Sequence, residues 1–486
     1  MSVVGGEPMS AGGLVARASL ARPNIVLILV DDLGWADLGC YGSSFYETPV
    51  LDGLAAAGMR FTDAYAASPV CSPTRASVMT GKYPVRVGVT QWIGGHAVGR
   101  LGDVPYFPFL PASEYTLARA LRDVGYRTWH VGKWHLGGRA SWPDRHGFDV
   151  NIGGCEWGFP THGYSSPYGC PTLQDGPDGE YLTDRLTDEA IALVSEADDQ
   201  PFFLNFWPYA VHTPIEAPDA LVGKYRDKAR LLGLDVLDPF SEGEAFPFWQ
   251  KRDLRVRRRT LQSDAAYAAM VENLDWNVGR LLTAIEESGK GGQTCVVFTS
   301  DNGGLSTAEG SPTCNAPLSE GKGWVYEGGV REPLIVRWPG VVSPGSVVSE
   351  PVTSPDLYPT LLEVAGSPVD ARQCRDGKSF VPSLRGEKFE RGPIFWYYPH
   401  YSNQGGQPAA AVRSGDWKMV LCYDGRAQEL YNLGLDISEA TDVAAGEPEI
   451  ARSLAAELER WCAAIGAYPP RPNPLDPFAD LDGRGL

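Results

Sequence analysis

Short apolar segments alternate with amphipathic ones along most of this chain. Residues 24–30 form a continuous run of large aliphatic side chains after one asparagine, the pattern of a strand buried on both faces of a sheet. Helical segments followed by strands recur after it, an order that predicts a mainly parallel or mixed sheet sandwiched by helices in an α/β fold. The expected helices are 48–58, 115–124, 182–197, 262–288 and 356–365, and the expected strands are 126–131, 202–206, 294–299 and 334–337.

The pattern changes after a segment rich in glycine, proline and charge at 367–392. Short apolar segments separated by turn sequences follow, which predicts a smaller C-terminal antiparallel sheet plus a helix. We expect a flexible N-terminal tail at 1–22, a main α/β domain at 23–385, and a C-terminal α+β subdomain at 386–486 with a surface-wrapping tail. The expected strands of this subdomain are 394–398, 409–413, 417–422 and 429–431, and its helix is 450–465.

The chain has 486 residues and a net charge of −18. This charge argues against nucleic acid and anionic membrane surfaces as partners, because the overall field repels both. No apolar run reaches transmembrane length, and residues 1–22 lack the apolar core of a secretory signal. The expected location is the cytoplasm, with a periplasmic or secreted protein as the alternative if a signal has been trimmed. The sequence leaves the oligomeric state open.

The nine cysteines are scattered, without a Cys-x-x-Cys pair or zinc-type spacing. We expect free thiols, and a disulfide between Cys155 and Cys170 is the alternative. The basic run 252–259 is interpreted as a solvated helix face, with an anion-steering patch as the second interpretation.

Four predicted strands end in polar residues suited to a reactive site. Asp31 and Asp32 follow the first strand, and Asp301 and Asn302 follow the strand at 294–299. The other two strands lead to Lys133 and His135, and to His212. Ligands of open parallel sheets bind beyond the carboxyl ends of the strands, so we expect these groups to converge there.

Oxygen donors dominate one part of this set. Asp31, Asp32, Asp301 and Asn302 offer only oxygen, which selects a hard divalent cation, calcium or magnesium. Three cationic residues, Arg75, Lys133 and Lys322, would add local positive charge beside that metal. A locally cationic pocket could then hold a dianion in an otherwise acidic protein.

The segment around Cys71 is the most informative in the chain. Ser72 is expected to cap a helix with Pro73 at its first position and Gly81 at its end, which places Cys71 just before the helix N-terminus. Free backbone N–H groups and the helix dipole attract an anion there. Arg75 in the first turn can bind an oxyanion with two hydrogen bonds.

This segment, Ala67 to Thr80, resembles the active-site segment of the type I sulfatases of the alkaline phosphatase superfamily, whose cysteine is oxidised after translation to formylglycine. The resemblance extends over nearly the whole chain. The other motifs that carry it are Asp31-Asp32-Leu33-Gly34-Trp35, Gly132 to Gly137, His212-Thr213-Pro214, Ser300 to Gly303, the loop around Lys322, and the strands within Val412 to Asn432.

The resemblance implies a sulfatase that hydrolyses sulfate monoesters through a formylglycine hydrate made from Cys71 by a formylglycine-generating enzyme. Arg75 would support the formylglycine, and His135 would act as the base. The calcium ion (or magnesium) would be held by Asp31, Asp32, Cys71, Asp301 and Asn302, and the sulfate by Lys133, His212 and Lys322.

The substrate is expected to be a sulfated small molecule or oligosaccharide. The enzyme is expected to be an exo-acting carbohydrate sulfatase. Aromatic faces stack on sugar rings and imidazoles can bind hydroxyls. Two alternatives stay open: a phosphonate monoester or phosphodiester hydrolase of the same superfamily, and an inactive homologue that binds sulfated glycans. The candidate substrate contacts are Trp92, His96, Trp157, His162 and His400.

Overall fold

A computed structural model describes residues 22–370, 372–373, 375–476 and 478 of the chain. The expected tail at 1–22 thus lies outside the described residues, except for its last position. Cys374 also lies outside them. No helix among the described residues is long and apolar enough to cross a membrane. The eight cysteines that the structure describes are all free, including Cys155 and Cys170.

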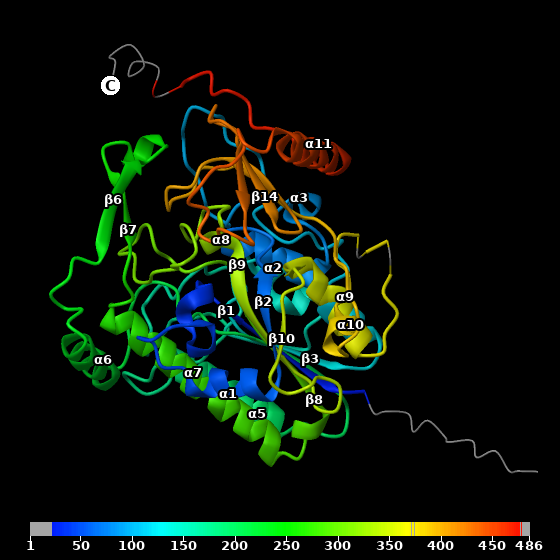
Figure 1. The fold of residues 1–486 in the computed structure, drawn as a ribbon. Helices are drawn as coiled ribbons and strands as arrows, with labels where there is room; N and C mark the ends of the chain where they lie inside the picture. The colour runs from blue at the N-terminus through cyan, green and yellow to red at the C-terminus, as the bar shows by residue number, and fades with distance from the viewer. Residues whose placement is uncertain (1–21, 371, 374, 477, 479–486) are drawn as a thin grey trace, which may run out of the picture.

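A mixed sheet forms the centre of the molecule (Figure 1). In the described residues it has nine strands, eight of them in the order β10-β2-β9-β8-β1-β5-β3-β4, and β11 also pairs with β2. Strand β1 runs parallel to both β5 and β8, whereas β9 is antiparallel to β8 and to β2. The strands are β1 (Asn24–Val30), β2 (Met59–Tyr65), β3 (Arg127–Gly132), β4 (Val150–Ile152), β5 (Phe202–Trp207), β8 (Thr294–Ser300), β9 (Arg331–Arg337), β10 (Ser346–Val348) and β11 (Val352–Thr353).

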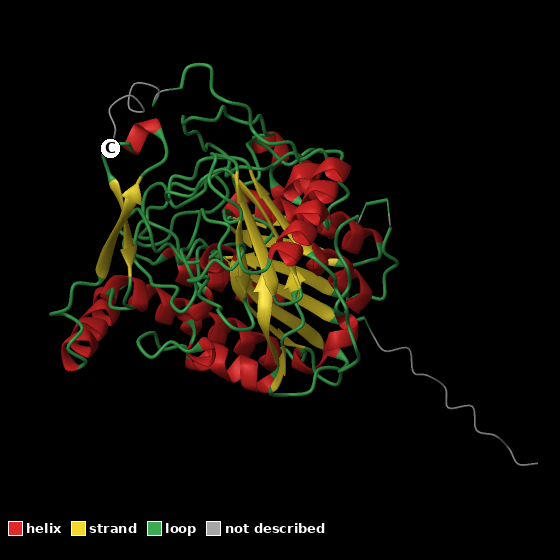
Figure 2. Cartoon of the chain, turned by 45° about the horizontal axis from the view of Figure 1, so that its top comes forward, coloured by secondary structure: helices red, strands yellow, loops and turns green. Residues whose placement is uncertain are grey.

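Helices cover both faces of this sheet, so the continuous apolar runs of its central strands are buried on both sides (Figure 2). Val26, Ile28 and Val30 of β1 pack into one core with α1, α5 and α7, while Ile25 and Leu27 pack into the other with α2, α4 and α9. The helices are α1 (Pro49–Ala57), α2 (Cys71–Thr80), α3 (Pro84–Val87), α4 (Leu117–Asp123), α5 (Leu182–Ser195), α6 (Asp219–Leu231), α7 (Ala265–Glu287), α8 (Glu327–Val330), α9 (Leu357–Val364) and α10 (Val381–Leu384).

A second, antiparallel sheet of four strands in the order β12-β13-β14-β15 lies in the C-terminal part of the described chain. Helix α11 (Pro448–Ile465) packs on it through Leu454 and Leu458. The predicted fold class, a helix-covered sheet followed by a small antiparallel sheet with one helix, is confirmed. The strands are β12 (Ile394–Tyr398), β13 (Ala409–Ser414), β14 (Trp417–Cys422) and β15 (Glu429–Asn432).

Two local predictions are wrong. The basic run does not form a helix face, because 255–259 is strand β7 (Arg255–Arg259), paired antiparallel with β6 (Phe240–Ala245) in a hairpin that projects from the main body (Figure 1). Ser72 does not cap α2. The helix begins at Cys71 with Val70 at the N-cap, and the Ser72 hydroxyl accepts a hydrogen bond from the backbone N–H of Ile93 at 3.1 Å.

Candidate active site

The carboxyl ends of β1 and β8 bring four oxygen-bearing side chains together. Val30 pairs with Ser300 at the end of the two parallel strands, so Asp31 and Asp32 emerge beside Asp301 and the residue after it. The backbone N–H of Asp32 donates to Oδ1 of Asp301 at 3.2 Å, and the amide of Asn302 donates to Oδ1 of Asp32 at 2.8 Å. The convergence expected at this edge of the sheet is thus present.

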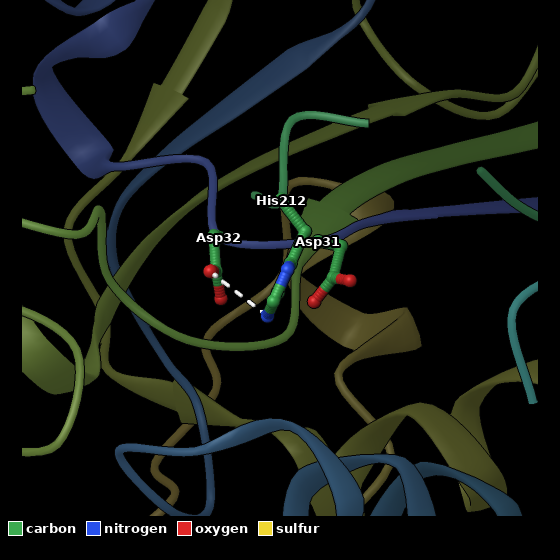
Figure 3. Close-up of side chains that lie close together, drawn as sticks. All are labelled: Asp31, Asp32 and His212. Carbon is green, nitrogen blue, oxygen red and sulfur yellow. Dashed lines mark ion pairs between the residues drawn. The ribbon is translucent and has the colours of Figure 1, made fainter. Parts of the chain in front are cut away.

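His212 comes to the same place from the loop after β5. The backbone N–H of Asp31 donates to the carbonyl of Ala210 at 3.1 Å, and the N–H of Val211 donates to the carbonyl of Asp31 at 2.8 Å. These two hydrogen bonds join the loop to the end of β1. One ligand atom each from Asp31, Asp32 and His212 lies within 4.8 Å of the others, as Figure 3 shows for these three buried side chains.

Cys71 is buried at the first residue of α2, beside His135. The Cys71 Sγ lies 3.3 Å from Nδ1 of His135, and Nε2 of His135 lies 3.1 Å from the carbonyl oxygen of Ile93. Because a carbonyl can only accept, Nε2 carries the proton and Nδ1 is the acceptor that faces the thiol.

Three buried cations surround the carboxylates. Arg75 donates from Nε to Oδ2 of Asp301 at 2.9 Å, and its Nη2 lies 2.7 Å from the same oxygen. Lys133 reaches Oδ2 of Asp31 at 2.5 Å, and Lys322 reaches Oδ2 of Asp32 at 2.7 Å. Each lysine or arginine thus has a carboxylate partner within the cluster, which lowers the cost of burying its charge.

The buried environment keeps both histidines neutral. Burial, and then the Lys322 ammonium, lowers the pKa of His212 to about 3. Burial, and then Lys133, lowers the pKa of His135 well below its usual value. Nδ1 of His212 faces the carbonyl of Thr213 at 2.9 Å and so holds the proton, which leaves Nε2 to accept from Lys322 Nζ at 2.9 Å.

The carboxyl groups of Asp31 and Asp32 differ in the direction in which their pKa is shifted. Burial raises the pKa of Asp31 to about 8, and the opposing effects of Lys133 and Arg75 do not reverse this. Burial would also raise the pKa of Asp32, but the Lys322 ammonium, which donates to this carboxylate, holds it below its usual value. Burial raises the pKa of the Cys71 thiol, so the unmodified side chain is a poor thiolate nucleophile.

Two buried oxygens in the cluster have no hydrogen-bond partner: Oδ1 of Asp31 and Oδ1 of Asn302. Oδ1 of Asp31 lies 3.5 Å from Nη2 of Arg75, beyond a good hydrogen bond. Buried polar atoms are almost always hydrogen-bonded, so these two oxygens at one strand edge are suited to a cation. The donor set fits a hard divalent metal.

A cavity of about 830 Å³ opens above Cys71. His135, His212 and Lys322 share its floor with the cysteine, whereas Arg75 and Lys133 lie behind it and do not line it. Its walls are formed by Trp92, Ile93, Glu156, Gly158, Phe159, Pro160, Thr161, His162, Gly163, Thr213, Pro214, Glu216, Glu309, Asn403 and Gln404.

Only two of the five candidate substrate contacts are among the residues that line the cavity. Trp92 and His162 line the cavity. Trp157 lies behind His162, with ring centroids 6.0 Å apart, and is not part of the wall. His400 is buried between Thr90 and Asp103, and the exposed His96 contacts the same aspartate, so neither reaches the cavity.

Several wall residues were not among the predicted site residues. Phe159 stacks on the imidazole of His212, with centroids 6.2 Å apart and planes 9° apart. Asn403 and Gln404 come from the segment after β12, and Glu309 from the loop after β8. Aromatic and amide residues in loops are too common to reveal by themselves that they meet at a site.

The fold and this geometry are those of a hydrolase of anionic esters, with side chains that could hold a metal ion. The sulfatase family model matches residues 23–367, and the model for the C-terminal part of N-sulphoglucosamine sulphohydrolase matches residues 321–463. The chain belongs to the type I sulfatase family of the alkaline phosphatase superfamily.

Individual proteins agree with this assignment. The chain is 32% identical to N-acetylgalactosamine-6-sulfatase of Mus musculus over 455 residues, 90% of this chain and 79% of that one. It is 30% identical to Ps i-CgsB, whose crystal structure in complex with k-i-k-neocarrahexaose superposes with a TM-score of 0.71 over 90% of this chain and 92% of that one. The phosphonate monoester hydrolase of Agrobacterium radiobacter shares the fold, with a TM-score of 0.64 and 22% identity over 91% of this chain and 96% of that one.

Proposed function

We propose that this sulfatase removes sulfate from carbohydrate monoesters as an exo-acting enzyme, with Cys71 matured to formylglycine and a calcium ion in the carboxylate cluster. The observation that carries the proposal is the position of Cys71, on the floor of the cavity beside His135 and Lys322. Maturation by a formylglycine-generating enzyme would precede folding, because Cys71 is buried once the helix is packed.

Asp31, Asp32, Asp301 and Asn302 would hold the calcium ion, together with residue 71. Three carboxylates face three cations in this cluster, so a divalent ion would leave a net positive charge for a sulfate group. When present, formylglycine supplies a hydrated aldehyde as the nucleophile, and the metal makes its hydroxyl more acidic.

The remaining chemistry belongs to the side chains of the floor. Nδ1 of His135 is a neutral acceptor that faces residue 71 and can take its proton. Lys322 holds a proton at Nζ, 2.9 Å from Nε2 of His212, so this pair can deliver a proton to a leaving oxygen. Lys133 and Arg75 hold the carboxylates of Asp31 and Asp301 in position.

Two features of the cavity support a carbohydrate. Aromatic faces from Trp92 and Phe159 and neutral amides from Asn403 and Gln404 are the groups that bind sugar rings and hydroxyls. N-acetylgalactosamine-6-sulfatase is named for a sulfated sugar, and Ps i-CgsB was crystallised with a carrageenan-type hexasaccharide.

The test combines peptide mass spectrometry with a substrate panel. Active protein should carry an aldehyde at residue 71 and release sulfate from monosulfated sugars and from 4-nitrophenyl sulfate. Cys71→Ala should abolish turnover while leaving the melting temperature nearly unchanged. An unaltered thiol in fully active protein would contradict the proposal. Faster turnover of phosphodiesters or phosphonate monoesters would favour the alternative hydrolase, and inactivity of the modified protein on every ester would favour a glycan-binding role.

A further inference from the structure

The wall of the cavity carries an excess of negative charge. Glu156, Glu216 and Glu309 all line it and are exposed. Lys322 is the one lysine or arginine among the lining residues that the structure describes. A cavity that must admit a sulfate ester therefore has an acidic wall above a cationic floor.

Each of these carboxylates is held in place by neutral donors. Glu156 accepts from the indole N–H of Trp142 at 2.9 Å, and Glu216 from the backbone N–H of Tyr164 at 2.9 Å. Glu309 accepts from the side-chain amide of Gln404 at 3.1 Å. None of the three forms an ion pair with a described residue. Glu309 does interact electrostatically with Lys322 and Lys251, so the charges of Glu156 and Glu216 are the ones held in the wall without a cationic partner.

The basic side chains that contact the floor or the wall residues already have partners. Lys251, which is not a lining residue, donates from Nζ to the carbonyl of the wall residue Asn403 at 2.8 Å. Lys322 bonds to Asp32 at 2.7 Å and so belongs to the floor. Arg258 of the hairpin forms ion pairs with Glu244 and Glu320 at 2.9 and 2.7 Å. A second anionic group on a substrate would therefore meet three carboxylates and find no lysine or arginine in the wall.

We propose that this wall selects by charge: it accepts a sulfate ester whose alcohol part is a neutral or amino sugar, and it rejects one that bears a carboxylate or a second sulfate. The inference rests on the proposed function, because it concerns the alcohol part of the same substrate. The floor would bind the one sulfate, and the glutamates would repel further anions and attract an ammonium group.

The test uses three aryl sulfates whose phenolate leaving groups differ in the charge of a substituent that a methylene group separates from the ring: 4-aminomethyl-, 4-hydroxymethyl- and 4-carboxymethylphenyl sulfate. The kcat/KM of the hydroxymethyl ester should exceed that of the carboxymethyl ester by about tenfold or more, and the aminomethyl ester should be at least as good as the hydroxymethyl ester. Raising the salt to about 0.5 M should shrink these differences, because exposed charges are then screened.

A triple variant, Glu156→Gln, Glu216→Gln and Glu309→Gln, keeps each hydrogen-bond acceptor and removes the charge. It should bring the hydroxymethyl to carboxymethyl ratio close to one. The matched control removes the same number of charges from three exposed glutamates that do not line the cavity. It should keep the wild-type ratio. Its substitutions are Glu287→Gln, Glu387→Gln and Glu459→Gln.

Equal rates for all three esters in the wild type, or a ratio unchanged in the triple variant, would overturn the charge selection while leaving the sulfatase activity intact. If no ester were hydrolysed, the proposed function would fail for these substrates. The charge selection would then be decided by calorimetric dissociation constants of the same esters on Cys71→Ala, where tighter binding of the carboxymethyl ester would exclude it.

Discussion

Two residues of the active site, Asp32 and His135, have left-handed backbone conformations with φ of 62° and 53°. Such conformations are uncommon outside glycine and cost of order 1 kcal/mol each, so the surrounding contacts must impose them. The N–H of Asp32 is held by Asp301, and that of His135 by the carbonyl of Cys155 at 3.1 Å. The backbone is therefore fixed where two functional side chains must point into the site.

The first prediction concerns His135. His135→Asn should lower kcat by about a hundredfold or more, because Nδ1 is lost as the proton acceptor beside residue 71. KM should change much less, since the side chain faces Cys71 and the cations that bind sulfate are retained. Steady-state kinetics with 4-nitrophenyl sulfate measure both constants.

His162→Asn is the matched control, because His162 lines the same cavity but is exposed and lies in its wall. This control should change KM more than kcat. A His135→Asn variant with wild-type kcat would exclude His135 as the base.

At the scale of elements, the β6–β7 hairpin supports the loop that carries Lys322. Arg258 of β7 donates from Nε and Nη2 to Oε1 of Glu320 at 2.9 and 2.7 Å, two residues before Lys322. It also holds Glu244 on the partner strand β6 at 2.9 Å. A two-point arginine contact of this kind fixes orientation as well as distance.

The second prediction follows from this contact. Arg258→Met should raise KM for sulfate esters by about three- to tenfold, because the Lys322 loop loses an anchor and sulfate binding weakens. Arg257→Met is the control on the same strand: its guanidinium stacks on Phe240 at 4.2 Å and contacts no part of the Lys322 loop. Equal KM values for the two variants would show that the hairpin does not position the loop.

Buried charges also join the two sheets. Glu327 of α8 accepts from Lys418 of β14 at 2.9 Å and from Arg331 at 3.1 Å. Lys418 lies equally close to Glu439, at 2.9 Å. Burial would raise the pKa of Glu327, but Lys418 and Arg331 lower it to about 2, whereas burial raises the pKa of Glu439 to about 7.

The third prediction is that Glu327→Gln and Glu439→Gln have opposite pH dependence. A carboxylate whose folded pKa is lowered stabilises the protein above its unfolded value of about 4.5, and this contribution disappears as the pH falls toward 2. Glu327→Gln should therefore cost about 3 kcal/mol near pH 7 and much less near pH 3. The melting temperature between pH 3 and 8 measures this.

The contribution of Glu439 to stability changes with pH in the opposite direction. Its raised pKa means that the folded protein holds the proton up to about pH 7, so its stabilising effect is lost as the pH rises from about 4.5 to 7. Glu439→Gln should gain melting temperature relative to the wild type as the pH increases across that range. Parallel pH profiles for the two variants would refute the assignment of charges.

The sequence predicted the main elements from their apolar patterns and part of the site from the ends of the strands, whereas Cys71 and Lys322 were assigned to the site through the resemblance to the sulfatases. Parallel strands end at one edge of a sheet, so residues such as Asp31 and Asp301 could be brought together without coordinates. The hairpin was missed because Arg255–Arg259 lacks the apolar alternation of a strand. Trp92 and His162 of the wall were predicted, whereas Glu309 and Gln404 were missed because they meet only through tertiary packing. The separation of His400 from the cavity likewise depends on contacts with Thr90 and Asp103.

For the molecule as a whole, a net charge of −18 must coexist with a site for an anion. The long-range field repels sulfated substrates, so binding depends on charges concentrated within a few ångströms at the end of the central strands. The cluster of three buried carboxylates and Asn302 at that edge has two oxygens without a hydrogen-bond partner, which suits it to a divalent cation. The metal is thus expected to stabilise the fold and the activity together.

The last prediction is that removal of the metal lowers the melting temperature as well as the activity. A ligand at a hundredfold excess over its Kd stabilises the folded state by about 2.7 kcal/mol, and a chelator such as EGTA should remove that contribution. Calcium should restore both properties, and magnesium should do so less fully, because magnesium demands near-ideal octahedral geometry whereas calcium accepts a less regular set of carboxylate and amide oxygens.

Asp301→Asn should bind less metal by elemental analysis and respond little to EGTA. Asp37→Asn is the matched control, since Asp37 is equally buried but bonds to Tyr267 and Thr313 at 2.6 and 2.7 Å outside the cluster. It should lose stability yet keep its metal and its response to the chelator. Full metal content in Asp301→Asn, or a wild-type melting temperature that EGTA leaves unchanged, would show that the cluster holds no ion.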